Sequence, residues 1–162
     1  MNTHVHPIPA VYDEHSRILV LGSFPSVRSR ETGFYYGHPN NRFWRVIGSI
    51  FGEQIPQTVT DKTNLLLSNH IALWDAIAEC DIIGSADSSI RNVVPNDLTP
   101  ILDCACVKAI FTNGRTADSL YRRYLRSKCG IDAIPLPSTS PANVAYSLDR
   151  LIGEWKIIRE FI

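Results

Sequence analysis

The chain has 162 residues, with 16 basic and 16 acidic side chains and a pI near 7.0. This length predicts a single domain, residues 1–162, with a substantial core. The zero formal charge excludes the strongly basic surface of a general nucleic-acid binder, so binding to nucleic acid would need a local basic patch. The N-terminal stretch has no basic start and no apolar run, and no window approaches the ~18 apolar residues of a membrane span. We therefore expect a cytoplasmic monomer without a membrane partner.

The cysteines, Cys80, Cys104, Cys106 and Cys129, show no Cys-x-x-Cys spacing and no paired histidine ligands. Cys104 and Cys106 are too close together for the usual zinc or iron–sulfur spacings. Reduced thiols suit a cytosolic protein. We expect no metal and no cofactor.

The first regular elements are a strand and a helix joined by a long loop. Residues 1–16 are polar and are expected to wrap the surface. The apolar run Ile18–Leu21, bounded by Gly22, is typical of a strand buried on both faces. The turn Gly22–Ser26 and a polar loop lead to a helix, in which apolar residues recur at i, i+3, i+4 and i+7: Phe43, Val46, Ile47 and Ile50.

The rest of the chain alternates between strands and helices. Residues 84–89, at the centre of the stretch 81–92, are expected to form a loop. Residues 136–143 contain prolines and hydroxyl side chains that exclude regular structure. Strands are expected at 71–75, 107–111 and 131–134, and helices at about 60–67, 95–103, 115–127 and 148–155. This alternation predicts an α/β fold, a three-layer α/β/α sandwich with a central, mainly parallel sheet of about four strands.

Loops that follow parallel strands meet at one edge of the sheet and line the ligand crevice. We therefore expect one pocket that receives Phe24, Tyr36, His38 and Asn41. Four arginines occur in the same stretch and either form a basic patch beside the pocket or belong to an ordinary solvated surface: Arg28, Arg30, Arg42 and Arg45.

Three motifs carry a resemblance to a known family: Gly22–Ser26 (GSFPS), Gly33–Trp44 (GFYYGHPNNRFW) and Pro137–Pro141 (PSTSP). Together they resemble the uracil-DNA glycosylase superfamily, related to its mismatch-specific branch and closest to the hypoxanthine-DNA (deoxyinosine) glycosylases. The resemblance covers nearly the whole chain. It implies a fold like that of uracil-DNA glycosylase and an enzyme that flips a damaged nucleotide out of DNA and hydrolyses its N-glycosidic bond.

Two positions depart from the wider superfamily. The mismatch-specific branch has a water-orienting asparagine where this chain has Phe24, and several branches have histidine or asparagine where it has Leu136. The resemblance thus implies the deoxyinosine pattern, in which the asparagine corresponding to Asn41 is the key catalytic residue. No lysine lies in the pocket motifs, so strand-cutting lyase chemistry is not expected.

We therefore expect a monofunctional glycosylase of base excision repair that acts on DNA with deaminated bases, hypoxanthine first. Two alternatives stay open: a uracil or mismatch-specific glycosylase, and a catalytically silent module that binds damaged DNA. The loss of the polar residues at Phe24 and Leu136 is the reason for the second alternative.

The expected catalytic residues each have a structural alternative. Asn41 assists the departing purine or the water, or it caps the following helix, a task that Asn40 can perform equally well. His38 assists protonation of the purine or structures its loop. Tyr36 is expected to stack on the extruded base, with Tyr35 placed in the core.

Binding residues are expected in two turns and at one helix start. In the turn Gly22–Ser26, Phe24 is expected to form an apolar wall of the pocket beside Pro25. Gly22 and Ser23 are expected either to contact the edges of the base or simply to form the turn. The stretch without regular structure near the end of the chain, here called the late loop, is expected to enter the DNA duplex and contact phosphates. The residues expected to do so are Ser138, Thr139, Ser140 and Pro141. Gly114 binds a phosphate through its amide or belongs to a routine cap. Asp75, at a strand end, activates the water or caps a helix.

Overall fold

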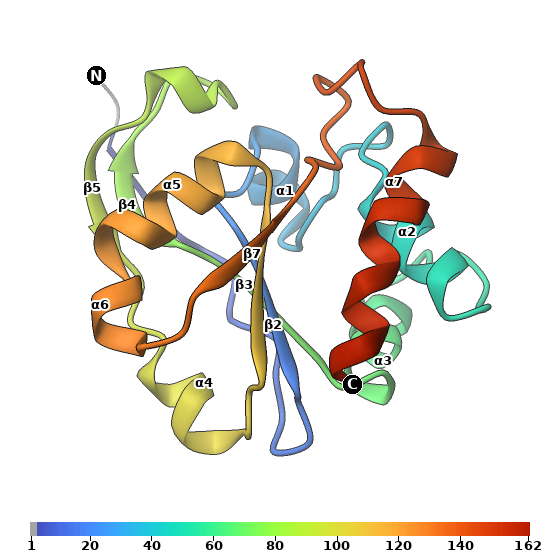
Figure 1. Cartoon of the computed structure of the whole chain (residues 1–162). Coiled ribbons are helices and arrows are strands. Elements are labelled where there is room, and N and C mark those ends of the chain that lie inside the picture. The colour runs from blue at the N-terminus through green and yellow to red at the C-terminus, as the bar shows by residue number, and fades with distance from the viewer. Residues whose placement is uncertain (1–2) are drawn as a thin grey trace.

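The computed structural model describes residues 3–162, and a four-stranded parallel sheet lies at its centre. The strands follow the spatial order β3 (Ile71–Asp75), β2 (Ile18–Gly22), β6 (Ala109–Asn113) and β7 (Ala133–Leu136). Strand β2 is buried along its whole length, as its apolar run predicts. Because all four strands run in the same direction, their carboxyl ends share one edge, at the top of Figure 1.

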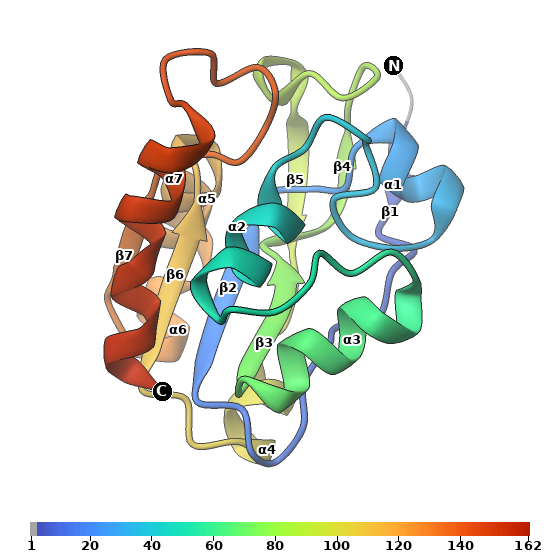
Figure 2. The same cartoon turned by 90° about the vertical axis from the view of Figure 1, so that its right-hand side faces the viewer.

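Helices cover both faces of this sheet (Figures 1 and 2). One face carries α2 (Phe43–Ile50), α3 (Val59–Ser68) and α7 (Leu148–Trp155). The opposite face carries α4 (Thr99–Cys104), α5 (Arg115–Tyr124) and α6 (Arg126–Cys129). Each face buries its own apolar cluster, so the predicted α/β/α sandwich with about four parallel strands is confirmed. Short elements complete the chain: α1 (Val27–Thr32) and the 3-10 helices η1 (Asp87–Ser89) and η2 (Lys156–Phe161).

A second, antiparallel sheet was not predicted. It has the order β1 (Thr3–Val5), β4 (Ile77–Asp81) and β5 (Arg91–Pro95). The expectation of a surface wrap over residues 1–16 is therefore wrong for β1, while residues 1–2 of that stretch lie outside the described residues. The loop expected over 84–89 lies between β4 and β5, and it contains the short 3-10 helix η1. These strands are short, largely half-buried or exposed, and shifted in register, so they lack a clear alternating pattern.

Several element boundaries also differ from the sequence prediction. Strands β6 and β7 each begin two residues later than expected, because pairing with β2 starts where Ala109 faces Ile18 and this sets the register of β7. The helix expected over 115–127 breaks at Leu125 into α5 and α6. The helix expected from residue 95 begins at Thr99, since Pro95 ends β5.

The N-terminal segment runs from the small sheet back along β3. The His6 amide donates to the Ala78 carbonyl at 2.7 Å, and Val11 and Leu73 exchange two backbone hydrogen bonds of 2.9 and 2.8 Å. This path brings His6 to the carboxyl end of β3. No helix within residues 3–162 is both long and apolar enough to cross a membrane.

Candidate active site

A cavity of about 310 Å³ lies at the carboxyl edge of the parallel sheet. Of the predicted site residues only Gly114 is absent from its lining, which includes Gly22, Ser23, Phe24, Pro25, Tyr36, His38, Asn41, Ser138, Thr139, Ser140 and Pro141. Asp75, Asp87 and Asn113 line it as well. The structure thus brings together segments that lie more than a hundred residues apart in the chain.

The floor of the cavity is formed where β2 ends. Gly22 is paired with Asp75 of β3, and a methyl group on Gly22 would lie 2.4 Å from Asp75 Oδ1 and 3.0 Å from the Tyr36 hydroxyl oxygen. Only glycine permits this close approach. Ser23 Oγ donates to Asp87 Oδ1 at 3.3 Å, and burial raises the pKa of Asp87 above its ordinary value.

Aromatic rings form the walls. Tyr36 stacks on Phe43 with ring centroids 4.2 Å apart, so Phe43 covers one face of the Tyr36 ring, and Tyr36 also lines the cavity. The Tyr36 backbone is left-handed, with φ of 53°, a conformation that costs ~1–3 kcal/mol and recurs at functional sites. Burial, with the Asp75 charge, raises the pKa of its hydroxyl. Tyr35 is a core residue, 2% exposed, whose hydroxyl is directed at the Ile8 and Pro9 carbonyls.

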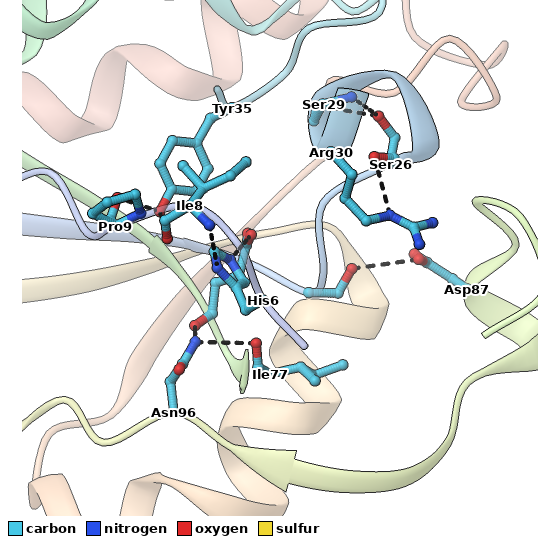
Figure 3. Close-up of polar contacts among 12 residues, drawn as sticks. His6, Ile8, Pro9, Ser26, Ser29, Arg30, Tyr35, Ile77, Asp87 and Asn96 are labelled. Carbon is cyan, nitrogen blue, oxygen red and sulfur yellow. Dashed lines mark hydrogen bonds and ion pairs between the residues drawn. The ribbon is translucent and has the colours of Figure 1, made fainter. Parts of the chain in front are cut away.

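Phe24 lines the cavity on the side next to α1, and Arg30 of that helix packs on its ring. The Arg30 guanidinium lies over the Phe24 ring, 5.5 Å from its centroid, and donates to the Gly84 carbonyl at 2.7 Å. Ser26 caps α1 by accepting from the Ser29 amide at 3.1 Å (Figure 3). The polar loop after β2 is therefore a short ordered helix, which the sequence did not predict.

The amide of Asn41 has a defined orientation. Its Oδ1 accepts from the Phe43 backbone N–H at 2.9 Å and from Thr139 Oγ1 at 3.0 Å. A backbone N–H can only donate, so the atom that faces Phe43 must be the carbonyl oxygen. Asn40, the alternative cap, does not cap α2. Its backbone N–H donates to His38 Nδ1 at 3.0 Å. The Asn41 oxygen binds the first backbone N–H of α2, whose N-cap residue is Arg42. Asn41 lines the cavity, and its N–H₂ group has no hydrogen-bond partner within residues 3–162.

Thr139 corrects another expectation, because it is fully buried, with 0% exposure, and its side chain is not available to a DNA phosphate. Thr139 Oγ1 accepts from Asn113 Nδ2 at 3.0 Å, while its backbone amide donates to Asn113 Oδ1 at 3.0 Å. The single proton of the hydroxyl is therefore directed to Asn41. Asn113 and Thr139 thus fix the catalytic candidate from behind.

The basic patch expected from four arginines is not formed by Arg42. This side chain is half-buried and donates to three carbonyls of the loop 137–147: Ser140 at 2.9 Å, Asn143 at 3.0 Å and Tyr146. Arg45 donates to the Pro39 carbonyl at 3.1 Å. Arg42 therefore ties the late loop to the start of α2.

The late loop itself is held by its own hydroxyl groups. Ser138 Oγ and Ser140 Oγ accept from the amides of Ser140 and Ala142 at 3.1 and 3.2 Å. Pro141 is exposed at the rim. Contact of this rim with DNA remains a prediction.

Gly114 and His38 both form hydrogen bonds that stabilise the loops around the cavity. The Gly114 amide donates to the Leu136 carbonyl at 2.9 Å, so it is not available to a phosphate, and its positive φ of 95° brings it against Ser138. His38 is exposed at the rim and accepts the Asn40 amide, so it structures its loop while it lines the cavity. Its part in catalysis remains a prediction.

The sequence analysis missed a buried histidine–carboxylate pair. His6 Nε2 and Asp75 Oδ2 are 2.8 Å apart, with side chains 4% and 5% exposed. Asp75 does not serve as a helix cap; its carboxylate is bound to His6 and lines the cavity. No pattern around His6 indicates this, because its position depends on the pairing of β1 with β4. Within residues 3–162 no three His, Cys, Asp or Glu side chains gather as metal ligands, and all cysteines are free.

The fold and the cavity define an open α/β protein with a cavity at the carboxyl edge of its parallel sheet, lined in part by aromatic rings. Residues 9–161 match the model of the uracil DNA glycosylase superfamily. The chain belongs to this superfamily.

Individual relatives resemble the chain along most of its length. A hypoxanthine DNA glycosylase of Methanosarcina acetivorans is 38% identical over 152 residues, which cover 93% of this chain and 94% of the relative. A hypoxanthine DNA glycosylase of Methanosarcina barkeri is 37% identical, with 83% and 85% of the two chains covered. A solution NMR structure of a Methanosarcina acetivorans protein, described as a candidate uracil DNA glycosylase, superposes with a TM-score of 0.80 at 36% identity and covers 94% of each chain.

Proposed function

We propose that this protein is a monofunctional DNA glycosylase that excises hypoxanthine from deoxyinosine in base excision repair. The observation that carries the proposal is the fixed amide of Asn41, a residue that lines the aromatic-walled cavity and whose oxygen accepts two hydrogen bonds. This arrangement supports an N–H₂ group that donates to the base. Membership of the superfamily and relatives named for hypoxanthine support it. We expect the enzyme to act as a cytoplasmic monomer on DNA.

Recognition of the base uses one aromatic face and one donor. An extruded purine stacks on the face of Tyr36 that Phe43 leaves uncovered, worth ~1–3 kcal/mol. Hypoxanthine presents N7 and O6 as acceptors to the Asn41 N–H₂ group. Phe24 provides an apolar wall, and Pro141 at the rim enters the space that the flipped base leaves.

The bond-breaking step follows from the same geometry. The C1′–N9 bond breaks with its electron pair on the base, and negative charge develops on the purine ring. A fixed N–H donor stabilises that charge more than it stabilises the neutral ground state, so it lowers the barrier. Water adds to C1′ and leaves an abasic site. No covalent intermediate with the protein is required.

The direct test offers duplexes with deoxyinosine, deoxyuridine or deoxyxanthosine, followed by alkaline cleavage. We expect abasic sites fastest from deoxyinosine, and no strand break before alkali. Faster cleavage at deoxyuridine would identify a uracil or mismatch glycosylase instead. Binding without any abasic product would identify a silent damage-binding module.

The role of Asn41 is tested by a pair of substitutions. Asn41→Asp keeps an oxygen for the Phe43 amide and the Thr139 hydroxyl but has no N–H, so we expect it to lose about 10²–10³-fold in single-turnover rate, as for other lost transition-state donors. Asn41→Ala is expected to lose as much, and in addition about 1 kcal/mol of stability with the cap. An Asn41→Asp enzyme near the wild-type rate would show that the donor is not needed.

A further inference from the structure

The hydrolytic water needs an acceptor, and Asn41 does not provide one. Its oxygen already accepts from the Phe43 amide and from the Thr139 hydroxyl, which fill both acceptor directions of an amide oxygen. The cavity must therefore hold the water through another group.

The Asp75 carboxylate is suited to this task by position. It ends β3 directly beside Gly22, and both line the cavity. Asp75 Oδ1 lies on the Gly22 side, where even a methyl group would come within 2.4 Å of it. The Asp75 backbone is fixed by Asn96, whose Nδ2 donates to the Asp75 carbonyl at 2.8 Å and to the Ile77 carbonyl at 3.0 Å (Figure 3).

His6 fixes the second oxygen of this carboxylate. The Ile8 amide donates to His6 Nδ1 at 3.2 Å, so Nδ1 carries no proton and the ring is neutral with its proton on Nε2 (Figure 3). The Nε2–H then donates to Asp75 Oδ2 at 2.8 Å. Aromatic rings pack around the imidazole, with centroids 5.9 to 6.3 Å away, from Phe24, Tyr35 and Trp74. His6 does not line the cavity, so it acts from behind Asp75.

We infer that Asp75 is the carboxylate that binds and deprotonates the attacking water, and that His6 is a positioning residue that leaves Asp75 Oδ1 facing the substrate. This inference rests on the proposed glycosylase function. As the C1′–N9 bond breaks, the water oxygen bonds to C1′ and one water proton passes to Asp75. The base leaves as an anion and takes up a proton, and Asp75 returns its own to solvent. The net reaction adds one water across the C1′–N9 bond.

Asn41 and Asp75 then act on different partners. Asn41 acts on the leaving base, so its loss affects bases differently according to the acceptors they present. Asp75 acts at the sugar and the water, which every substrate shares. The rate loss caused by Asp75→Asn is therefore expected to be the same for each base that the enzyme excises.

The test measures single-turnover excision and DNA affinity for Asp75→Asn, an isosteric change whose amide oxygen still accepts from His6. We expect the rate to fall about 10²–10⁴-fold, as for the loss of a general base, with unchanged Kd for the deoxyinosine duplex. Formate should raise the rate of Asp75→Ala by supplying a carboxylate, and should not raise that of the wild type or of Asn41→Ala. His6→Gln, which keeps an N–H donor, should retain more activity than His6→Phe, and both should lower kcat rather than raise KM.

A matched control separates chemistry from anchoring of the N-terminal segment. Asp81 also ties that segment down, by accepting from Thr3 Oγ1 at 2.5 Å, but it does not line the cavity. Asp81→Asn should leave the single-turnover rate unchanged. A rate loss in Asp81→Asn equal to that in Asp75→Asn, or a failure of formate to rescue Asp75→Ala, would overturn the inference.

Assays of the wild-type protein separate a failure of the proposed glycosylase function from a failure of the inferred role of Asp75. If wild-type protein forms no abasic site from any deaminated base, the proposed function fails, and the inference with it. If wild-type protein excises hypoxanthine and Asp75→Asn does so equally well, the inference alone fails.

Discussion

One hydroxyl group fixes the orientation of the Asn41 amide. Thr139 Oγ1 accepts from Asn113 and so has its only proton for Asn41. Together with the Phe43 backbone N–H it fixes the oxygen of Asn41. Orientation by packed, fully hydrogen-bonded neighbours removes the reorganisation that a loose amide would undergo during the reaction.

Replacing Thr139 by valine keeps its shape and removes this proton. The Asn41 oxygen then loses one of its two hydrogen bonds, and Asn113 Nδ2 loses its acceptor. The free-energy cost of these losses is about 1–3 kcal/mol. We expect the single-turnover rate to fall about 5–150-fold if that energy is expressed in the transition state, with little change in DNA affinity. Single-turnover excision and filter-binding measurements separate the two quantities.

Thr139→Ser is the control, since serine keeps the hydroxyl in a buried site at the cost of one methyl group. It should retain most of the activity. If valine and serine prove equally slow, packing of the methyl group would explain the loss and the hydroxyl would not.

The late loop is positioned by the elements around it. Arg42, next to the start of α2, reaches three of its carbonyls, and the Trp155 indole of α7 donates to the Pro137 carbonyl at 2.9 Å. Helices α2 and α7 lie side by side on one face of the sheet (Figures 1 and 2). A loop without regular structure is thus fixed by the elements on both sides of it.

Arg42→Ala should loosen this loop. Hydrogen bonds to a charged group contribute ~1.5–3 kcal/mol each, although water replaces part of this when the side chain is removed. We expect faster proteolytic cleavage within residues 137–147 and weaker binding to a deoxyinosine duplex. Limited proteolysis with mass spectrometry locates the cut.

Arg45→Ala is the control variant. Within residues 3–162, the Arg45 side chain donates one hydrogen bond, to the Pro39 carbonyl, and none to the loop 137–147. Its proteolysis pattern should match the wild type. Unchanged cleavage of the loop in Arg42→Ala would show that Trp155 and the loop's own hydroxyl bonds are sufficient.

Charge is balanced over the whole molecule, with 16 basic and 16 acidic residues, so DNA binding must rely on local groups. A cleft beside the active-site cavity shares Asp87 with it and carries three arginines: Arg91, Arg115 and Arg123. We predict that the flanking phosphates bind in this cleft. None of its arginines belongs to the four that the sequence suggested for a basic patch.

Arg115 is exposed in that cleft at the start of α5. If it neutralises one phosphate, Arg115→Ala should reduce the slope of log K against log salt by about 0.9 and leave the rate at saturating enzyme unchanged. Titrations at several salt concentrations measure the slope. Arg159→Ala, in η2 and outside the lining of both the cavity and this cleft, should not change it. An unaltered slope for Arg115→Ala would exclude this cleft as the phosphate-binding surface.

The sequence by itself determined the parallel sandwich and most of the residues that meet in the cavity. Continuous apolar runs specify buried strands such as β2, and chain direction alone places the residues that follow them at one edge. Both are local properties, so periodicity and turn chemistry reveal them.

Only the tertiary structure decided the roles within the cavity. Asn41 bonds to Thr139, 98 residues away, and Asp75 bonds to His6, 69 residues away, on a segment whose short strand has no recognisable pattern. Hydrogen bonds of this kind depend on ångström-scale contacts between distant segments, and those contacts exist only once the sheets have paired and packed.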